Sequence, residues 1–452
     1  MISRKKIKQI TDYILRISPA DQTEVLVFKS NLGLTRFANN EIHQNLAREN
    51  FSVSVRVVLG QKIGVGSASN PSKEALAQLV KRTVEATKYQ KPDPDFKTLP
   101  GPQKYSPVAA FSQQTAAFSP HKRAVEVRKV VRLASEGHLS AFGVFQTGLN
   151  EVVVANSLGI FAYHPGTFSN LNVTMKKGGP VSPSQGGQSG YAAFNAGDVR
   201  TIKTEEVARQ ARQKAAFSKR MIEVPKGEYE VVLEEAAVNE MMVYMAYLGF
   251  GGRAYHERRS FLSGKLGGQV LGENITIWDD ALNPAGLPMP FDFEGVAKKK
   301  VVLIEKGVAR AVVYDHYHAQ KHGVEPTGHG LPAPNTLDAL VGHLHFEPGG
   351  ETKDELVRKI KNGLLITRFW YVNAHHHNLV LTGMTRDGTF LIRNGEIVAP
   401  VYNLRFTQSI PEALRRVTGI SKELKVEESW VGANLVPALR IAGFRFTGVS
   451  KL

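Results

Sequence analysis

A single glutamate, Glu240, is the strongest candidate for chemistry in this chain. It lies in residues 231–244 (VVLEEAAVNEMMVY), where a strand-like run ends at Leu233 and a helical run follows. A glutamate on such a helix can act as the general base of a hydrolase when a bound metal ion lowers the pKa of the attacking water. The neighbouring positions from which such a metal would be held are Asn239 and, five residues later, Tyr244.

The residue types at these two positions argue against a metal. Zinc peptidases with the motif H-E-x-x-x-H place imidazole at both, because zinc is held by imidazole, thiolate or carboxylate. Side chains five residues apart on an ideal helix also diverge by about 140°, so nothing draws Asn239 and Tyr244 together. We therefore expect no metal here. Glu240 is interpreted as a solvated or salt-bridged helix glutamate, with a residual catalytic role as the alternative.

Histidines elsewhere are the obvious replacement ligands, since the chain has 14 of them and no cysteine. His318 and His322 would share one face of a helix, so a metal there stays an open alternative. His343 and His345 would point to one side of a strand but lack a visible third ligand. The triplet 375–377 lies between strand-like runs, where successive side chains alternate in direction, so we expect at most adventitious nickel or zinc.

The composition is that of a soluble globular protein. At 452 residues the chain is too long for one ordinary core, so we expect two domains or one large α/β assembly. No apolar run approaches the ~20 residues needed to cross a bilayer. Residues 1–17 have isoleucines on one helical face, which predicts an amphipathic helix rather than a signal peptide. The lack of cysteine excludes disulfides and suits the cytoplasm.

The net charge of +16 is distributed along the chain. Only short basic clusters occur, at residues 4–6, 258–259 and 298–300, and no nucleic-acid-binding module is recognisable. A spread positive charge is typical of a solvated surface or of an acidic partner, so we do not expect nucleic acid as the main partner.

The pattern of elements predicts an α+β protein in two parts. Residues 1–222 are an expected α/β domain with a mixed sheet and helices, and residues 91–107 are a proline-rich connector within it. Residues 223–452 are an expected β-rich domain, barrel-like or with a curved antiparallel sheet. The predicted elements are strands at 24–28, 34–37, 51–59, 141–146, 151–156 and 160–164, helices at 72–89, 121–136, 204–220 and 234–248, a loop at 178–190, and hairpins at 301–314 and 389–400.

Several segments, in order along nearly the whole chain, resemble the TldD/PmbA family, whose TldE (PmbA) members carry the historical label of DNA gyrase modulators. The matching segments are GLTRFANNEIHQN (33–45), SVRVVLGQKIGVGS (54–67), RRSFLSGKLGGQVLGENITIWDD (258–280), AQKHGVEPTGHG (319–330), LLITRFWYV (364–372), LTGMTRDGTFLIRNGEIVAPVYNLRFTQS (381–409) and VPALRIAGFRFTG (436–448).

This resemblance implies a dimer-forming, cytoplasmic peptidase system. TldD members resemble zinc metallopeptidases, with an H-E-x-x-x-H motif and a cysteine ligand, and TldE members lack the motif and form the non-catalytic partner. The pair trims unfolded or modified peptides, which enter an enclosed chamber as an extended strand. Here Asn239 and Tyr244 stand at the histidine positions, Glu240 remains, and the cysteine is missing. The chain is therefore similar to the TldE type, without a cofactor of its own and with zinc expected only in a TldD-type partner.

The family chamber also suggests where a peptide would lie. Strands and turns near residues 367–407 combine charged, amide and aromatic side chains that could grip an extended peptide. A structural role is the alternative, with Arg386 and Asp387 as an internal ion pair and Trp370 in the core. The candidates are Arg368, Trp370, Tyr371, Arg386, Asp387, Asn403 and Arg405.

Two other functions stay open at this point. One is an autonomous metallopeptidase that uses an unrecognised histidine-based site. The other is a basic protein associated with DNA or a topoisomerase complex. The sequence leaves open the substrate and whether the native state is a homodimer or a heterodimer.

Overall fold

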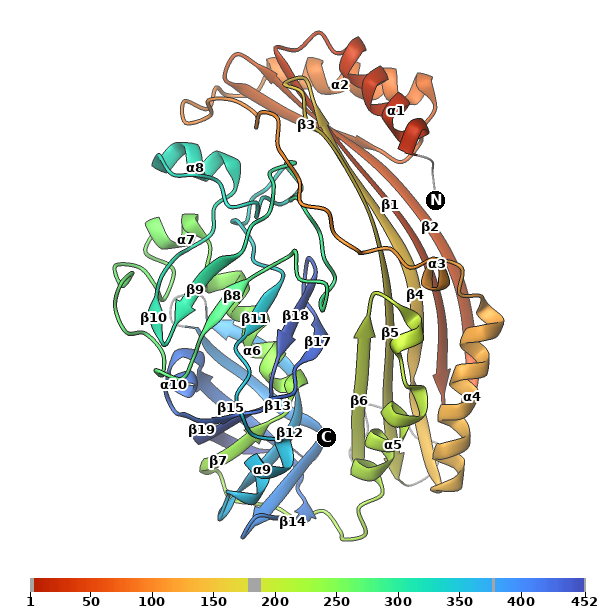
Figure 1. The fold of residues 1–452 in the computed structure, drawn as a ribbon, viewed down its shortest axis with the longest axis vertical. Coiled ribbons are helices and arrows are strands. Elements are labelled where there is room, and N and C mark those ends of the chain that lie inside the picture. The colour runs from red at the N-terminus through yellow and green to blue at the C-terminus, as the bar shows by residue number, and fades with distance from the viewer. Residues whose placement is uncertain (1–3, 178–187, 376–378, 451–452) are drawn as a thin grey trace.

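A long, curved antiparallel sheet forms the N-terminal half of the protein (Figure 1). The structure is a computed structural model, and it describes residues 4–177, 188–375 and 379–450. The strands follow the order β3-β2-β1-β4-β5-β6, and every neighbouring pair is antiparallel. They are β1 (Gln22–Ala38), β2 (Glu41–Leu59), β3 (Lys62–Ala68), β4 (Leu139–Asn156), β5 (Phe161–Lys177) and β6 (Ser189–Ala196).

The two faces of this sheet have different neighbours, because successive side chains of a strand point to opposite sides. Val25 and Val27 of β1 pack in the core that helices α1 and α2 complete. Leu26, between them, belongs to a cluster with Met289 and Phe291 of the C-terminal half. The elements outside the sheet in this half are α1 (Arg4–Ile17), α2 (Lys73–Lys88), α3 (Gln113–Ala116), α4 (Pro120–Glu136), α5 (Thr204–Ala215) and the 3₁₀ turn η1 (Val199–Thr201).

Helices α4 and α5 pack on the same face as α1 and α2. Phe145 of β4 and Val173 of β5 contribute to the core beneath α4 and α5, and Val153 of β4 contributes to the core beneath α1 and α2. These positions are all odd-numbered in continuous strands, so they share one face of the sheet. The opposite face is therefore left to the C-terminal half, and Figure 1 shows the curve of the sheet turned toward that half.

A small barrel is the centre of the C-terminal half. Strands β12, β7, β19, β15 and β13 pair in that order, and an additional pairing of β12 with β13 closes the ring of five. All of these pairs are antiparallel except β12 with β7, which is parallel. The strands of this sheet are β7 (Gly227–Leu233), β12 (Asn362–His375), β13 (Val380–Arg393), β14 (Glu396–Pro400), β15 (Asn403–Ser409), β16 (Val417–Ile420) and β19 (Leu439–Ser450).

A third sheet packs beside the barrel, with helix α6 in contact with both. Helix α6 touches β12 of the barrel and the neighbouring strands β17 and β18 of the third sheet, and its apolar side chains join one large core. The strand order of this sheet is β10-β9-β8-β11-β18-β17. The remaining elements are β8 (Ile277–Asp279), β9 (Val301–Glu305), β10 (Val308–Ala309), β11 (Leu344–Phe346), β17 (Lys425–Glu428), β18 (Ala433–Val436), α6 (Glu235–Gly249), α7 (Gly252–His256), α8 (His316–His322), α9 (Lys353–Arg358) and α10 (Ile410–Arg415).

The predicted architecture is confirmed: an α/β half is followed by a β-rich half that contains a closed barrel. The predicted strands at 24–28 and 34–37 are, however, parts of one strand, β1. The polar stretch between them continues the strand, because β2 and β4 pair with it from both sides and satisfy its backbone groups. The proposed domain boundary at residue 222 stays a prediction.

The hairpins were predicted with mixed success. Asn394 and Gly395 both have positive φ, of 48° and 80°, and they connect β13 to β14 as the Asn-Gly pair indicated. In the other hairpin β9 is as predicted, but its partner β10 is only Val308–Ala309 instead of a strand over 309–314. Most of the predicted loop at 178–190 lies outside the described residues, and Ser189 already belongs to β6.

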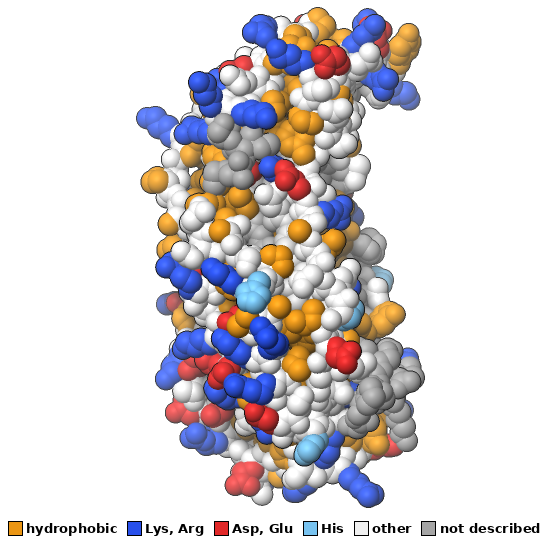
Figure 2. Space-filling model, turned by 90° about the vertical axis from the view of Figure 1, so that its right-hand side faces the viewer, with side chains coloured by type: hydrophobic (Ala, Val, Ile, Leu, Met, Phe, Trp, Pro, Cys, Tyr) orange, Lys and Arg blue, Asp and Glu red, His pale blue; other side chains and the backbone are white. Residues whose placement is uncertain are grey.

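Lys and Arg side chains are spread over the side of the molecule that Figure 2 presents, with Asp and Glu among them. This distribution agrees with the scattered basic residues of the sequence rather than with one continuous positive stripe. Among the residues that the structure describes, no helix is both long and apolar enough to span a membrane.

Candidate functional site

Helix α6 carries the three residues of the predicted motif. Strand β7 ends at Leu233, and Glu234 occupies the N-cap position with extended backbone angles before α6 begins at Glu235. The helix is continuous through Gly249, without the widened turn that would bring side chains five residues apart together. The helix therefore directs positions 239 and 244 to different parts of the molecule.

Asn239 and Tyr244 each bind protein groups on different strands. The side-chain amide of Asn239 donates to the carbonyl oxygen of Glu428 at 2.9 Å, and its oxygen accepts from the side chain of Asn434 at 2.9 Å. The Tyr244 hydroxyl donates to the carbonyl oxygen of Val372 at 2.6 Å. The first pair of bonds holds α6 against β17 and β18, and the last holds it against β12. An amide and a phenol used in this way do not fit a zinc ion.

Glu240, between them, opens into a cavity of about 540 Å³ that lies between the N-terminal sheet and the C-terminal half. Its carboxyl group is partly buried, and this burial raises its pKa, while the positive charge of Arg368 acts in the opposite direction. The residues that line the cavity are Asn170, Asn172, Tyr191, Asn195, Ala236, Asn239, Glu240, Arg368, Phe369, Trp370, Tyr371, Val372, Glu427 and Glu428.

Arg368 and Asp387 form an ion pair beside this cavity. The Arg368 guanidinium donates to Asp387 Oδ2 through Nε at 3.0 Å and through Nη2 as well. Ser189 of β6 donates its hydroxyl to Asp387 Oδ1 at 2.7 Å, so the pair also joins the two halves of the protein. The guanidinium lies 4.2 Å from the ring centre of Tyr191 and 5.4 Å from that of Trp370, which is a cation–π arrangement.

The predicted peptide-binding residues divide into those at the cavity and those outside it. Arg368, Trp370 and Tyr371 line it directly, and the side chains of Trp370 and Tyr371 are 40% and 75% exposed. Arg386 lies over the Trp370 ring at 5.0 Å, and the expected contact between Arg386 and Asp387 has its charged atoms 3.9 Å apart. The two β15 candidates do not line this cavity: they are Asn403 and the exposed Arg405.

Residues from the N-terminal sheet complete the site, and we did not predict them. Asn172 donates its side-chain amide to Asn170 Oδ1 at 3.1 Å, and Asn170 donates to Asn195 Oδ1 at 2.5 Å. Asn195 in turn donates to the carbonyl oxygen of Val426 on β17 at 2.9 Å. The sequence did contain a signal for these residues, because asparagine is uncommon in strands and several asparagines in a strand call for an explanation. An N-x-N pair inside a strand places two amides on one face.

Strand β17 is an edge strand of its sheet, and asparagine side chains donate hydrogen bonds to two of its backbone carbonyl groups. Asn195 binds the carbonyl of Val426, and Asn239 binds that of Glu428. Exposed edges are sites at which another chain can add as a strand. Because these carbonyls are already bonded, a peptide in this cavity would meet side chains rather than extend the edge of β17.

A second cavity of about 720 Å³ adjoins the first. The two share Asn195 and Glu428 among their lining residues, so β17 lies along their common border. The second cavity is rich in apolar groups, among them Phe28, Val152, Phe168, Phe194, Leu287, Met289, Phe293, Trp430 and Val431. Together the cavities offer a polar and an apolar compartment between the two halves of the protein.

Two buried glutamates near the start of α6 are each balanced by lysines. Burial by itself raises the pKa of Glu234, but the charges of Lys214, Lys353 and Lys425 hold it well below the usual range. Lys353 lies 3.0 Å from the carboxylate of Glu234, and Lys425 lies 3.2 Å from that of Glu235. Lys214 comes from α5, so this network also connects the two halves.

The histidines do not assemble a metal site within the described part of the chain, where no group of three metal-binding side chains is close enough. His318 and His322 are on helix α8, but His318 Nδ1 lies 2.9 Å from Asp315 and the His322 ring stacks on His256. Of the triplet at 375–377, residues 376 and 377 lie outside the described residues.

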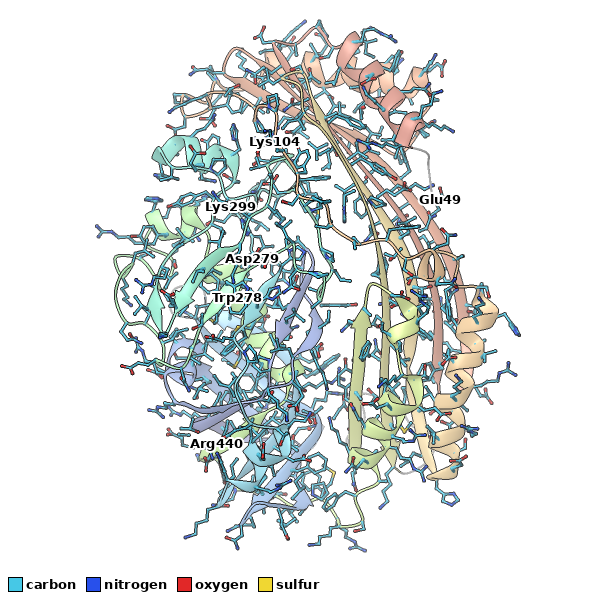
Figure 3. The ribbon with its side chains drawn as sticks, viewed as in Figure 1. Glu49, Lys104, Trp278, Asp279, Lys299 and Arg440 are labelled. Carbon is cyan, nitrogen blue, oxygen red and sulfur yellow. The ribbon has the colours of Figure 1, made fainter. Side chains whose placement is uncertain are left out.

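His343 and His345 are both buried in the C-terminal half. His343 Nε2 lies 3.1 Å from the Leu287 carbonyl, and burial lowers the pKa of this histidine to about 3. Asp279, labelled in Figure 3, accepts from the backbone N–H of His343 at 2.8 Å and pairs with His329 at 3.0 Å. These contacts hold neighbouring strands and loops together.

Comparison with known proteins identifies relatives along nearly the whole chain. The models of the PmbA/TldA metallopeptidase family match as domain 1 over residues 23–87, as the central domain over 109–216 and as the C-terminal domain over 226–448. Metalloprotease PmbA of Escherichia coli O157:H7 is 22% identical over 97% of this chain and 97% of its own length. A metalloprotease of Methanothermobacter thermautotrophicus is 26% identical over 58% of this chain and 57% of its own length.

Solved structures share the fold. TldE from Thermococcus kodakarensis superposes with a TM-score of 0.87 at 22% identity, covering 98% of this chain and all (100%) of that one. A Thermotoga maritima protein described as a candidate modulator of a DNA gyrase superposes with a TM-score of 0.84 at 18% identity, with 98% and 100% covered.

Proposed function

Because this chain belongs to the PmbA/TldD metallopeptidase family, we propose that it is a non-catalytic, TldE-like subunit that supports peptide processing by a zinc-dependent partner. The observation that carries the proposal is what the side chains at the two histidine positions of the H-E-x-x-x-H motif bind. Asn239 and Tyr244 bind protein main chain, and neither residue type is a zinc ligand. Glu240 therefore has no metal-activated water beside it to deprotonate.

The adjoining cavities suit a binding role in such a complex. They lie between the two halves of the protein and combine a polar compartment, with four asparagines and an arginine, and an apolar one. Small-molecule and peptide sites are concave and usually combine apolar walls with a few placed polar groups. In this proposal the chain works in the cytoplasm, holds part of an extended peptide and presents it to the zinc site of a TldD-type subunit.

Co-expression with the cognate H-E-x-x-x-H paralogue tests this proposal. We expect a complex of the two chains by size analysis, and cleavage of an unfolded peptide by the complex but not by this chain alone. Changing the motif glutamate of the paralogue to glutamine should abolish cleavage. The matched Glu240→Gln variant of this chain should raise KM at most and leave kcat nearly unchanged, because Glu240 lines the cavity but has no zinc partner.

Two results would reject the proposal. One is peptidase activity of this chain alone, purified without tag and dialysed against chelator, with zinc retained in stoichiometric amount. The other is a Glu240→Gln complex whose kcat falls as far as that of the paralogue variant. Either result would mean that this chain itself catalyses peptide cleavage.

A further inference from the structure

The cavity beside α6 is acidic within a basic protein. The chain carries a net charge of +16, yet three glutamates and one arginine line this cavity. The arginine, Arg368, is already paired with Asp387. Glu240 and Glu427 face the cavity, and Glu428 lies at the border that it shares with the apolar one. The cavity therefore holds negative charge that its own cation does not balance.

Glu427 is the most telling of the three. It is only 9% exposed, and its carboxylate makes no hydrogen bond or ion pair with the residues that the structure describes. Buried carboxylates are ordinarily paired, because an unpartnered charge away from water costs several kcal/mol. Nearby Glu234 and Glu235 follow this rule, with lysines at hydrogen-bonding distance. Glu427 departs from it and opens into the cavity instead.

We propose that this cavity binds the primary ammonium group of an extended peptide, with Glu427 as its main partner and Glu240 and Glu428 around it. The proposal deepens the function proposed above and rests on it for the identity of the ligand as a peptide. Asn172 contributes a side-chain oxygen that accepts no hydrogen bond from the described residues and can receive a peptide N–H.

An ammonium group suits this cavity better than a metal ion does. Within the described residues, no three carboxylate or imidazole groups come close enough together to ligate a metal. The glutamates come from a helix and from an edge strand and surround a space of about 540 Å³. An ammonium has three N–H donors that point in different directions, and it can use partners spread in this way.

The charged surroundings of Glu427 make the proposed binding dependent on pH. Burial raises the pKa of Glu427 to about 7, Lys425 lowers it, and the carboxylates near it raise it further. A cation therefore binds best once Glu427 has lost its proton, above this pH. The other groups that act on or titrate beside Glu427 are Lys425 and Glu428 of its own strand, Glu234 and Glu235 at the start of α6, and Tyr191 of β6.

Direct binding to the full chain, purified without a tag, tests the proposal. The probes are decapeptides of Gly, Ala and Ser in three forms: with a free N-terminus, with an acetylated N-terminus, and acetylated with one internal lysine. Calorimetry at pH 8 should show at least about tenfold tighter binding of the lysine peptide than of the acetylated peptide without lysine. The free-terminus peptide at pH 7 shows whether an α-ammonium is accepted as well.

The variant Glu427→Gln should lose most of the preference for a charged peptide, because it keeps the shape of the main partner's side chain and removes its charge. Glu423→Gln is the matched control, since Glu423 is exposed and lies outside the cavity. For the lysine peptide, which stays charged from pH 6 to 8, affinity should rise over this range in the parent and rise clearly less in Glu427→Gln, where only Glu240 and Glu428 still titrate.

Equal affinity for charged and acetylated peptides, or a preference that Glu427→Gln leaves undiminished, would overturn the ammonium site. Neither outcome bears on the proposed function. That function is rejected instead if the complex with the paralogue does not form or does not cleave the peptide. Binding of the free-terminus peptide alone assigns the site to peptide N-termini. Binding of the lysine peptide alone assigns it to side chains.

Discussion

Replacing Glu427 by glutamine should stabilise the protein, and the gain should depend on pH. The folded protein holds this carboxyl group almost fully buried, with no hydrogen-bond or ion-pair partner among the described residues, and its pKa is raised from 4.5 to about 7. Each pKa unit corresponds to about 1.4 kcal/mol, so the ionised side chain costs the folded state roughly 3 kcal/mol. A neutral glutamine of the same shape avoids this cost.

The direction of this pH dependence follows from whether the folded or the unfolded state binds the proton of Glu427. Between pH 4.5 and about 7 the unfolded chain has lost the Glu427 proton while the folded chain keeps it. Stability falls with rising pH wherever the folded state binds more protons. The cost of Glu427 is therefore absent below pH 4.5 and complete above pH 7. Relative to the parent, Glu427→Gln should gain little at pH 5 and up to about 3 kcal/mol at pH 8.

Urea unfolding followed by tryptophan fluorescence measures this difference. All three tryptophans are in the C-terminal half, and Trp370 lines the same cavity as Glu427, so the signal reports the relevant part. Comparing variant with parent at each pH cancels the other titrating groups. Glu423→Gln should show the same small effect at both pH values. A Glu427→Gln gain that is equal at pH 5 and pH 8, or larger at pH 5, would refute the reasoning.

Three further outcomes are expected. Asn434→Ala should lower the free energy of unfolding by roughly 1–3 kcal/mol in urea titrations, because it leaves the partly buried Asn239 oxygen without its donor and the buried Leu344 N–H without its acceptor. The double variant Asn239→His with Tyr244→His should retain no stoichiometric zinc after chelator dialysis, measured by elemental analysis, since the continuous helix keeps the two positions apart. Arg368→Lys should cost roughly 1–3 kcal/mol by the same unfolding assay, because lysine cannot donate two hydrogen bonds to Asp387 in the geometry of a guanidinium. No loss in that variant would mean that the ion pair contributes nothing to stability.

Local sequence was enough for much of the fold. Helix α6 was predicted within one residue at each end, because the chain around Glu240 has a strong helical run directly after a strand. The turn at Asn394 and Gly395 was predicted because few residues adopt positive φ readily. The loss of zinc ligands also needs no coordinates, since it follows from residue types.

Only part of the candidate site could be predicted from the sequence. Arg368, Trp370 and Tyr371 were expected and do line a cavity, while Asn403 and Arg405 were expected and do not. The missing half comes from distant segments, including the asparagines of β5 and β6 and the glutamates of β17. No local pattern predicts which of these strands will lie opposite α6.

The sequence by itself determined which chemistry is possible here, because the identity of a side chain decides whether it can ligate zinc or carry a charge. The tertiary structure alone decided that Glu427 is buried with no ion-pair partner among the residues that the structure describes, whereas Glu234 is buried among lysines. The physical reason is that burial and charge pairing depend on neighbours far apart in the chain. The pairing of strands and the packing of the two halves bring those neighbours together.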